Sequence, residues 1–81
     1  MGNLEWKNEK TKLVAAWILN TPEIWNSARQ FAITNPDAPI LYRAWLKSNN
    51  MQKEVTPDGI PVLDPELHFG ELSDVLWTLT I

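Results

Sequence analysis

The longest apolar stretch of the chain covers residues 13–19, LVAAWIL. Because seven consecutive apolar residues leave no polar face, this stretch predicts a helix that packs on nearly every side, at the centre of the fold. Asn8 is a suitable N-cap for a helix over about 9–19, since its side-chain oxygen can accept a hydrogen bond from a free backbone N–H. The side chains expected to face inward are Leu13, Val14, Trp17 and Ile18.

The most regular helical pattern follows directly. Asn20 or Thr21 would cap this second helix, and Pro22 in its first turn costs no hydrogen bond, because a first-turn N–H has no partner within the helix. Apolar residues at i, i+1, i+4, i+7 and i+8 form one continuous stripe, which consists of Ile24, Trp25, Ala28, Phe31 and Ala32. Asn35 ends the helix, since a residue before proline is disfavoured in the helical conformation.

A third helix is predicted to open at residues 37–39 and to end at the polar residues 48–50. Arg43 and Lys47 are four residues apart and are expected to point outward into solvent. The inner side of this helix is expected to carry Ile40, Leu41, Ala44, Trp45 and Ser48.

The last segment predicts a short C-terminal helix that starts near Glu71. Its apolar residues have helical spacing and are Leu72, Val75, Leu76 and Leu79. Because the chain ends on apolar residues, we expect this end to dock on the body of the protein.

Residues 56–59, TPDG, lie between the third and fourth helices and carry proline and glycine where a type I turn prefers them. Pro61 cannot donate a hydrogen bond to a ladder, so this segment is either an edge hairpin or an ordered loop. We expect a mainly α, compact three- to four-helix domain over residues 1–81, with a Pro/Gly loop or short hairpin before the C-terminal helix.

Five tryptophans are many for 81 residues, and each can bury about 150–250 Å². Trp17, Trp25 and Trp45 lie on the apolar stripes and are expected in the core. Trp6 precedes the first helix, and Trp77 lies beside the stripe of the last. These two either pack on each other to close a small core or act as anchors for a partner, where exposed tryptophan is enriched.

The chain has no cysteine, which excludes disulfides, thiolate zinc sites and cysteine nucleophiles. His68 is the one histidine, between Glu66 and Glu71, and it lacks the further histidine or cysteine ligands typical of a zinc site. Nothing resembles a nucleophile elbow or a phosphate-binding glycine loop. We therefore expect a protein that is not an enzyme and that uses no metal and no cofactor.

No apolar run approaches the roughly 18 residues of a membrane span, and the polar first residues do not form a secretory signal. We expect a cytoplasmic protein that does not bind membranes.

Charge is divided unevenly along the chain. Residues 1–53 hold seven bases and four acids, for a net charge of +3, whereas residues 54–81 hold six acids and no base, for −6. The acidic part suits a basic partner surface, since charge complementarity speeds encounter and fixes orientation. The basic residues that would instead serve nucleic acid are Lys7, Lys10, Lys12, Arg29, Arg43 and Lys47. A sequence pI near 4.9 makes this alternative the weaker one.

Residues 8–28 read NEKTKLVAAWILNTPEIWNSA, and residues 56–76 read TPDGIPVLDPELHFGELSDVL. Both segments resemble a family of small uncharacterised accessory proteins of bacteriophages and related mobile elements, whose members read roughly NYETWNVALWINN near the start and TPDGV…EL near the end. The middle of the chain does not align, and a Trp-Asn pair of the family appears here as Lys12 and Leu13. The resemblance implies a mobile-element origin, a helical fold and a host-cell cytoplasm, but no activity.

We therefore expect a small accessory protein that binds a host protein or complex stoichiometrically, as an inhibitor of a host defence or metabolic complex. The apolar anchors would be Trp6 and Trp77, and the electrostatic rim would consist of Glu66, Glu71 and Asp74. The alternative is a nucleic-acid-associated regulator that uses the basic N-terminal two-thirds. A homodimer through the apolar C-terminus is a third hypothesis.

Overall fold

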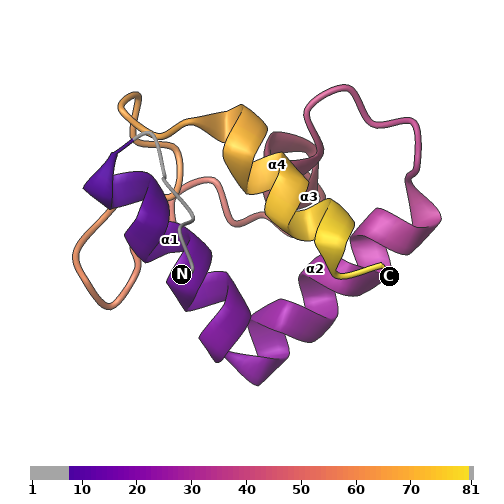
Figure 1. The fold of residues 1–81 in the computed structure, drawn as a ribbon, viewed down its shortest axis with the longest axis horizontal. Helices are drawn as coiled ribbons and strands as arrows, with labels where there is room; N and C mark the ends of the chain where they lie inside the picture. Colours follow the sequence, from indigo (N-terminus) through magenta and orange to yellow (C-terminus); the bar gives the residue numbers. More distant parts are fainter. Residues whose placement is uncertain (1–7, 81) are drawn as a thin grey trace, which may run out of the picture.

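Four helices make up most of residues 8–80, the part of the chain that the computed structural model describes (Figure 1). They are α1 (Glu9–Asn20), α2 (Pro22–Thr34), α3 (Leu41–Ser48) and α4 (Phe69–Thr78). The described residues include no β-strand, only an isolated antiparallel bridge between Val55 and Pro61. The predicted mainly α, compact three- to four-helix small domain is confirmed, with four helices.

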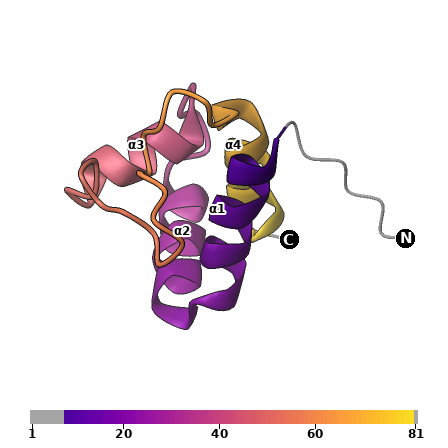
Figure 2. The ribbon, with the colours of Figure 1, turned by 90° about the vertical axis from the view of Figure 1, so that its left-hand side faces the viewer.

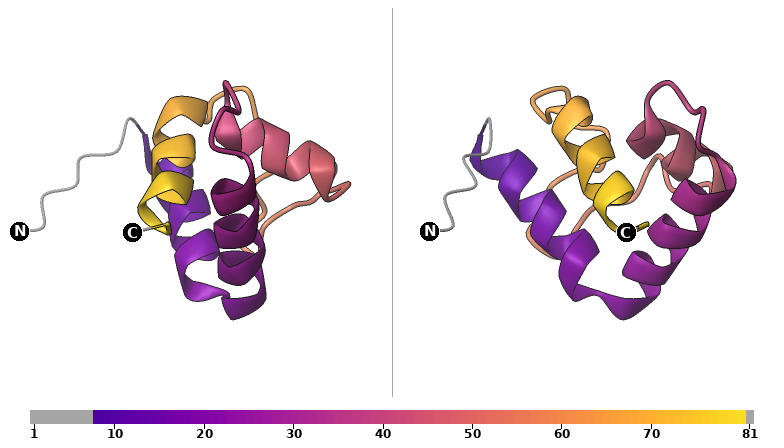
Figure 3. Two further views of the ribbon diagram at one scale, coloured as in Figure 1. Left: turned by 90° about the vertical axis from the view of Figure 1, so that its right-hand side faces the viewer. Right: turned by 45° about the vertical axis from the view of Figure 1, so that its right-hand side comes forward.

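A single residue, Thr21, separates α1 from α2, so the two helices diverge from one corner as the arms of a V (Figure 3). The predicted cap at Asn8 is confirmed, whereas Thr21 occupies the N-cap position of α2 without a side-chain cap bond. The side chain of Asn8 accepts a hydrogen bond from the Thr11 N–H at 2.8 Å, and Pro22 occupies the first turn of α2. α4 packs against both arms of the V.

The prediction that the apolar stretch forms a central helix is wrong. Val14, Ala15 and Ile18 are fully buried, but Leu19 is 45% exposed and Trp17 is half-buried. The reason is the position of α1, whose backbone lies against α2 and α4 and which reaches α3 through the contact between the Trp17 and Trp45 rings, so only part of its circumference is covered. Figure 2 shows α1 and α3 on different sides, with the segment between α3 and α4 running across the gap.

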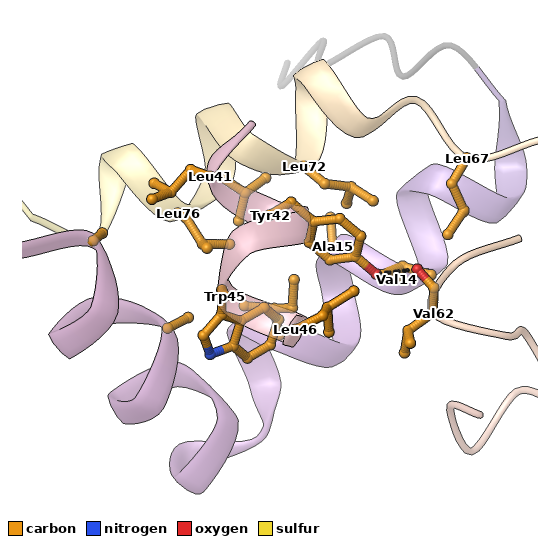
Figure 4. Packing of buried hydrophobic residues seen from close by; sticks show 14 of the residues in the cluster. Val14, Ala15, Leu41, Tyr42, Trp45, Leu46, Val62, Leu67, Leu72 and Leu76 are labelled. Atoms are coloured by element: carbon orange, nitrogen blue, oxygen red, sulfur yellow. Dashed lines mark hydrogen bonds between the residues drawn. The ribbon is translucent and has the colours of Figure 1, made fainter. Parts of the chain in front are cut away.

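Aromatic rings from three helices meet in the core. Figure 4 shows the two that α3 contributes, Tyr42 and Trp45, among the buried aliphatic side chains. Trp45 is fully buried, with its ring centroid 6.5 Å from Trp17 and 6.0 Å from Tyr42, and Tyr42 in turn stacks on Phe69 at 5.8 Å. Of the three tryptophans predicted in the core, only Trp45 is fully enclosed. Trp17 and Trp25 are half-buried and pack against the core from its edge.

α3 begins later than predicted and is rotated about its axis relative to the prediction. Its buried residues are Leu41, Tyr42, Trp45 and Leu46. Ile40 is 42% exposed and Ser48 is also exposed, although both were expected inside. Burying a tyrosine requires a partner for its hydroxyl. The Tyr42 hydroxyl donates to the Val62 carbonyl at 2.7 Å, and burial raises the pKa of Tyr42.

The first turn of α3 is capped by another helix. Its own N-cap position, Ile40, makes no side-chain cap bond. Instead, the Tyr42 backbone N–H donates to the Ser73 hydroxyl of α4 at 3.0 Å, and that hydroxyl donates to the Phe69 carbonyl at 2.8 Å. The start of α3 is therefore fixed by packing against α4 and not by its own residues.

The segment between α3 and α4 combines the two predicted alternatives, a hairpin and an ordered loop. The Thr56 N–H donates to the Ile60 carbonyl at 2.9 Å and the Val62 N–H donates to the Glu54 carbonyl at 3.0 Å. These bonds flank the bridge, so Pro61 stands at a position that needs no N–H. Gly59 has a φ of 82°, which favours glycine.

α4 begins after His68, whose Nδ1 accepts a hydrogen bond from the Glu71 N–H at 3.1 Å. The four residues predicted at its inner side are all buried: Leu72, Val75, Leu76 and Leu79. The apolar C-terminal segment docks on the body as expected, at least as far as Leu79, which is 7% exposed.

Candidate interaction surface

The outward side of α4 carries three of the five predicted partner-binding residues. Because α4 buries its leucine and valine stripe, the residues beside and opposite this stripe reach the surface at least in part. Glu71, Asp74 and Trp77 follow one another at intervals of three residues, which makes each a neighbour of the next on a helix surface. We call these three residues the acidic α4 face.

Trp77 is half-buried and packs against the core, so its indole is fixed on one side and accessible on the other. The other predicted anchor, Trp6, lies outside the described residues. A fixed aromatic ring suits binding, because little side-chain freedom is lost when a partner covers it.

The two carboxylates of the acidic α4 face differ in their surroundings. The Asp74 carboxylate is exposed and has no hydrogen bond or ion pair within residues 8–80. Glu71 is half-buried in the first turn of α4, where the helix dipole favours negative charge. Asp74 is therefore the carboxylate with its full charge presented to solvent.

Glu66 has a structural partner and lies outside the acidic α4 face. Lys10 of α1 pairs with Glu66 at 2.5 Å and with Asp64 at 3.1 Å. The Asn8 side-chain amide donates to the Glu66 carbonyl at 2.6 Å. The predicted rim thus separates into Glu66, whose charge is balanced by Lys10, and the two acids on α4.

These contacts belong to a small group of residues that ties the start of α1 to the segment before α4. The Thr11 hydroxyl is its buried centre: it accepts from the His68 N–H at 3.0 Å and donates to the Asn8 side-chain oxygen at 2.8 Å. We call this group the α1 clasp, and its members are Asn8, Lys10, Thr11, Asp64, Glu66 and His68.

Electrostatics in the α1 clasp predict how stability depends on pH. The Glu66 backbone N–H and the Lys10 ammonium both lower the pKa of Asp64, while hydrogen bonds to Glu66 and Asp64 raise the pKa of Lys10. A lowered carboxylate pKa stabilises the fold above the unfolded value of about 3.9, and this contribution is lost as the pH falls through the folded pKa.

We therefore expect Asp64→Asn to be less stable than the wild type at neutral pH, with a difference that shrinks as the pH falls below about 4. Urea unfolding followed by circular dichroism between neutral and strongly acidic pH measures this difference. Asp74→Asn is the matched control, because the Asp74 side chain makes no hydrogen bond or ion pair in residues 8–80. A constant difference across the pH range would show that Asp64 does not act through its charge.

The described members of the predicted basic set are spread over three helices. Lys7 lies outside the described residues, and Lys10 is held in the α1 clasp. Lys12 lies on α1, whereas the Arg29 guanidinium lies 6.0 Å from the centre of the Trp25 ring on α2. Within residues 8–80, a shared pocket brings together the last two members of the set, Arg43 and Lys47 of α3.

His68 acts as a helix cap through Nδ1. Within the described range, 8–80, no three His, Asp or Glu side chains are grouped so that they could hold a metal ion. None of the helices in that range combines the length and the apolar character needed to cross a bilayer.

The sequence prediction missed the pocket that contains Arg43 and Lys47. Its signal was present, since Ile40, Arg43, Ala44 and Lys47 recur at i, i+3, i+4 and i+7, the spacing of a single helix face. The signal was misread because Ile40 was assigned to the core side.

Comparisons of this chain with protein-family models, curated proteins and solved structures find no match.

Proposed function

We propose that this protein acts by stoichiometric binding to a partner protein through the acidic α4 face. The resemblance to phage accessory proteins would make the partner a host protein or complex, and the binding an inhibition of host defence or metabolism. Trp77 would be the apolar anchor, with Asp74 and Glu71 as its charged rim.

One observation carries this proposal: a half-buried indole stands one helical turn from a carboxylate that has no partner in residues 8–80. Tryptophan dominates binding energy at many interfaces, and charged residues around such an anchor orient the partner. The surface fits a basic, apolar site on the partner. Glu66 would contribute less than first expected, because Lys10 already balances its charge.

The alternative function, nucleic-acid binding, receives less support. Lys10 is neutralised by two acids, and the remaining described cations of the predicted set are divided among α1, α2 and α3. Phosphate affinity depends on several cations acting together, and the net charge of the chain is −3.

The test is capture of a partner from host lysate by the tagged 81-residue chain, followed by affinity measurement with the purified partner. We expect Trp77→Ala to weaken this affinity by at least about tenfold, because it removes the anchor. Asp74→Lys should also weaken the affinity, with an effect that grows at low salt. Because Asp74 is exposed, this substitution leaves the core intact.

Trp25→Ala is the matched control, because Trp25 is also half-buried but lies on α2. Trp6→Ala tests the other predicted anchor. Retention of full affinity by both Trp77→Ala and Asp74→Lys would remove the acidic α4 face from the proposal. Capture that disappears with nuclease and weakens steeply with salt would favour the nucleic-acid alternative.

A further inference from the structure

A second surface of opposite charge lies on the outer side of α3. It is an open pocket of about 330 Å³ between α3 and the segment that follows it. We call it the α3 groove, and the residues that line it are Pro39, Ile40, Arg43, Ala44, Lys47, Gln52 and Leu63.

Part of the lining of the α3 groove is apolar. Ile40 is 42% exposed, Leu63 is half-buried, and Ala44 contributes a small side chain to the lining. An exposed isoleucine within a hollow gains more from being covered than an isolated surface residue does, because the surrounding apolar atoms also lose contact with water.

The charged residues of the α3 groove are all positive. Neither Arg43 nor Lys47 has an ion pair within residues 8–80, and no acidic residue lines the pocket. The Arg43 guanidinium lies 5.8 Å from the centre of the Phe69 ring, a cation–π contact that restricts its position. Lys47 stands one turn further along α3 and is exposed.

We propose that the α3 groove is a docking site for an acidic, apolar segment of a partner protein. The apolar side chains of that segment would cover Ile40 and Leu63, and its carboxylates would pair with Arg43 and Lys47. This inference adds a second contact surface to the proposed binding function, and it rests on that function only in taking the occupant to be a protein.

The dimensions of α3 set the size of the occupant. Eight residues of helix span about 12 Å, which corresponds to about two turns of a bound helix or about four residues of an extended strand. A contact this small is expected to be weak by itself. It would position a partner that is also held elsewhere.

The test uses a synthetic helical peptide of about 12 residues, with leucines at i, i+3, i+4 and i+7 and glutamates at most other positions. A control peptide keeps the leucines and replaces each glutamate by lysine. Titration of the isotope-labelled 81-residue protein by NMR should shift the backbone amides of the α3 groove with the acidic peptide and leave them unshifted with the basic one.

Matched substitutions on the protein separate charge from apolar contact. Lys47→Glu should weaken binding of the acidic peptide by about tenfold or more, and Lys53→Glu, an equal charge change at an exposed residue outside the groove, by less than about twofold. Ile40→Ser should also weaken binding, whereas Ile33→Ser, at an equally exposed isoleucine on α2, should not.

Three results would overturn this inference: equal binding of the two peptides, unchanged affinity in Lys47→Glu, or groove shifts that follow the protein's own concentration without peptide. The last result would assign the groove to a second copy of the chain. Asp74→Lys leaves the α3 groove intact, so peptide binding by this variant distinguishes failure of the groove from failure of the acidic α4 face.

Discussion

Replacing Trp45 by alanine is expected to lower the free energy of unfolding by about 3–5 kcal/mol, the range for removing a large aromatic side chain from a core. Trp45 is fully buried between the rings of Trp17 and Tyr42, and its Nε1 donates to the Ser27 hydroxyl at 3.1 Å. The substitution removes these contacts and leaves a cavity among three helices. Small domains have only about 5–15 kcal/mol of stability, so much of the population should unfold near 37 °C.

Thermal and urea unfolding by far-ultraviolet circular dichroism measure this loss independently of the other four tryptophans. Trp25→Ala is the control, because the same atoms are removed from a half-buried position on α2. Its cost should be clearly smaller, since solvent already reaches this side chain. Equal costs for the two variants would contradict the placement of Trp45 at the centre of the core.

Thr11→Val is expected to cost about 1–3 kcal/mol, although valine has nearly the same shape as threonine. The Thr11 hydroxyl is fully buried and joins two parts of the α1 clasp, accepting from the His68 N–H and donating to the Asn8 side chain. Valine keeps the packing and removes both bonds, which leaves the His68 N–H without its partner.

Thr34→Val provides the comparison, because Thr34 is exposed and its hydroxyl makes only local bonds, donating to carbonyls of its own helix and accepting from the neighbouring Asn35 side chain. We expect a change within about 0.5 kcal/mol for this control. Urea unfolding at neutral pH gives both values. If the two threonine variants lost the same stability, the clasp hydroxyl would contribute nothing beyond ordinary helix-surface bonding.

Local signals predicted much of the helix content. Asn8, Pro22 and the apolar stripe of α4 act within one or two turns, so their effects are visible in the sequence itself. The turn at Gly59 was predictable for the same reason, since the positive φ that it adopts favours glycine.

Long-range partners account for what was missed. α3 starts late because its first turn depends on Ser73, 31 residues away, and Tyr42 is buried because the Val62 carbonyl, 20 residues away, accepts its hydroxyl. A one-dimensional pattern contains no information on such pairings. The exposure of Ile40 follows from the rotation of α3 relative to the predicted orientation.

The candidate site was predictable in part for a related reason. Periodicity placed Trp77 beside the buried stripe of the last helix, and in the structure Trp77 is half-buried there while Asp74 on the same helix is exposed. It could not show that Lys10, 56 residues before Glu66, would pair with that acid. A count of charges along the chain indicates an interaction surface only when the charges that pair within the fold, such as Lys10 and Glu66, are left out of the count.

The α1 clasp also determines when the protein can complete its fold during synthesis. Asn8, Lys10 and Thr11 are synthesised 54 to 58 residues before the partners that they bind at residues 64–68. The first helix can form its own Asn8 cap early, but its long-range bonds must wait until those later residues have emerged. A ribosome that stalls before residue 64 would hold a chain in which the first helix is capped but not yet tied to the rest of the fold.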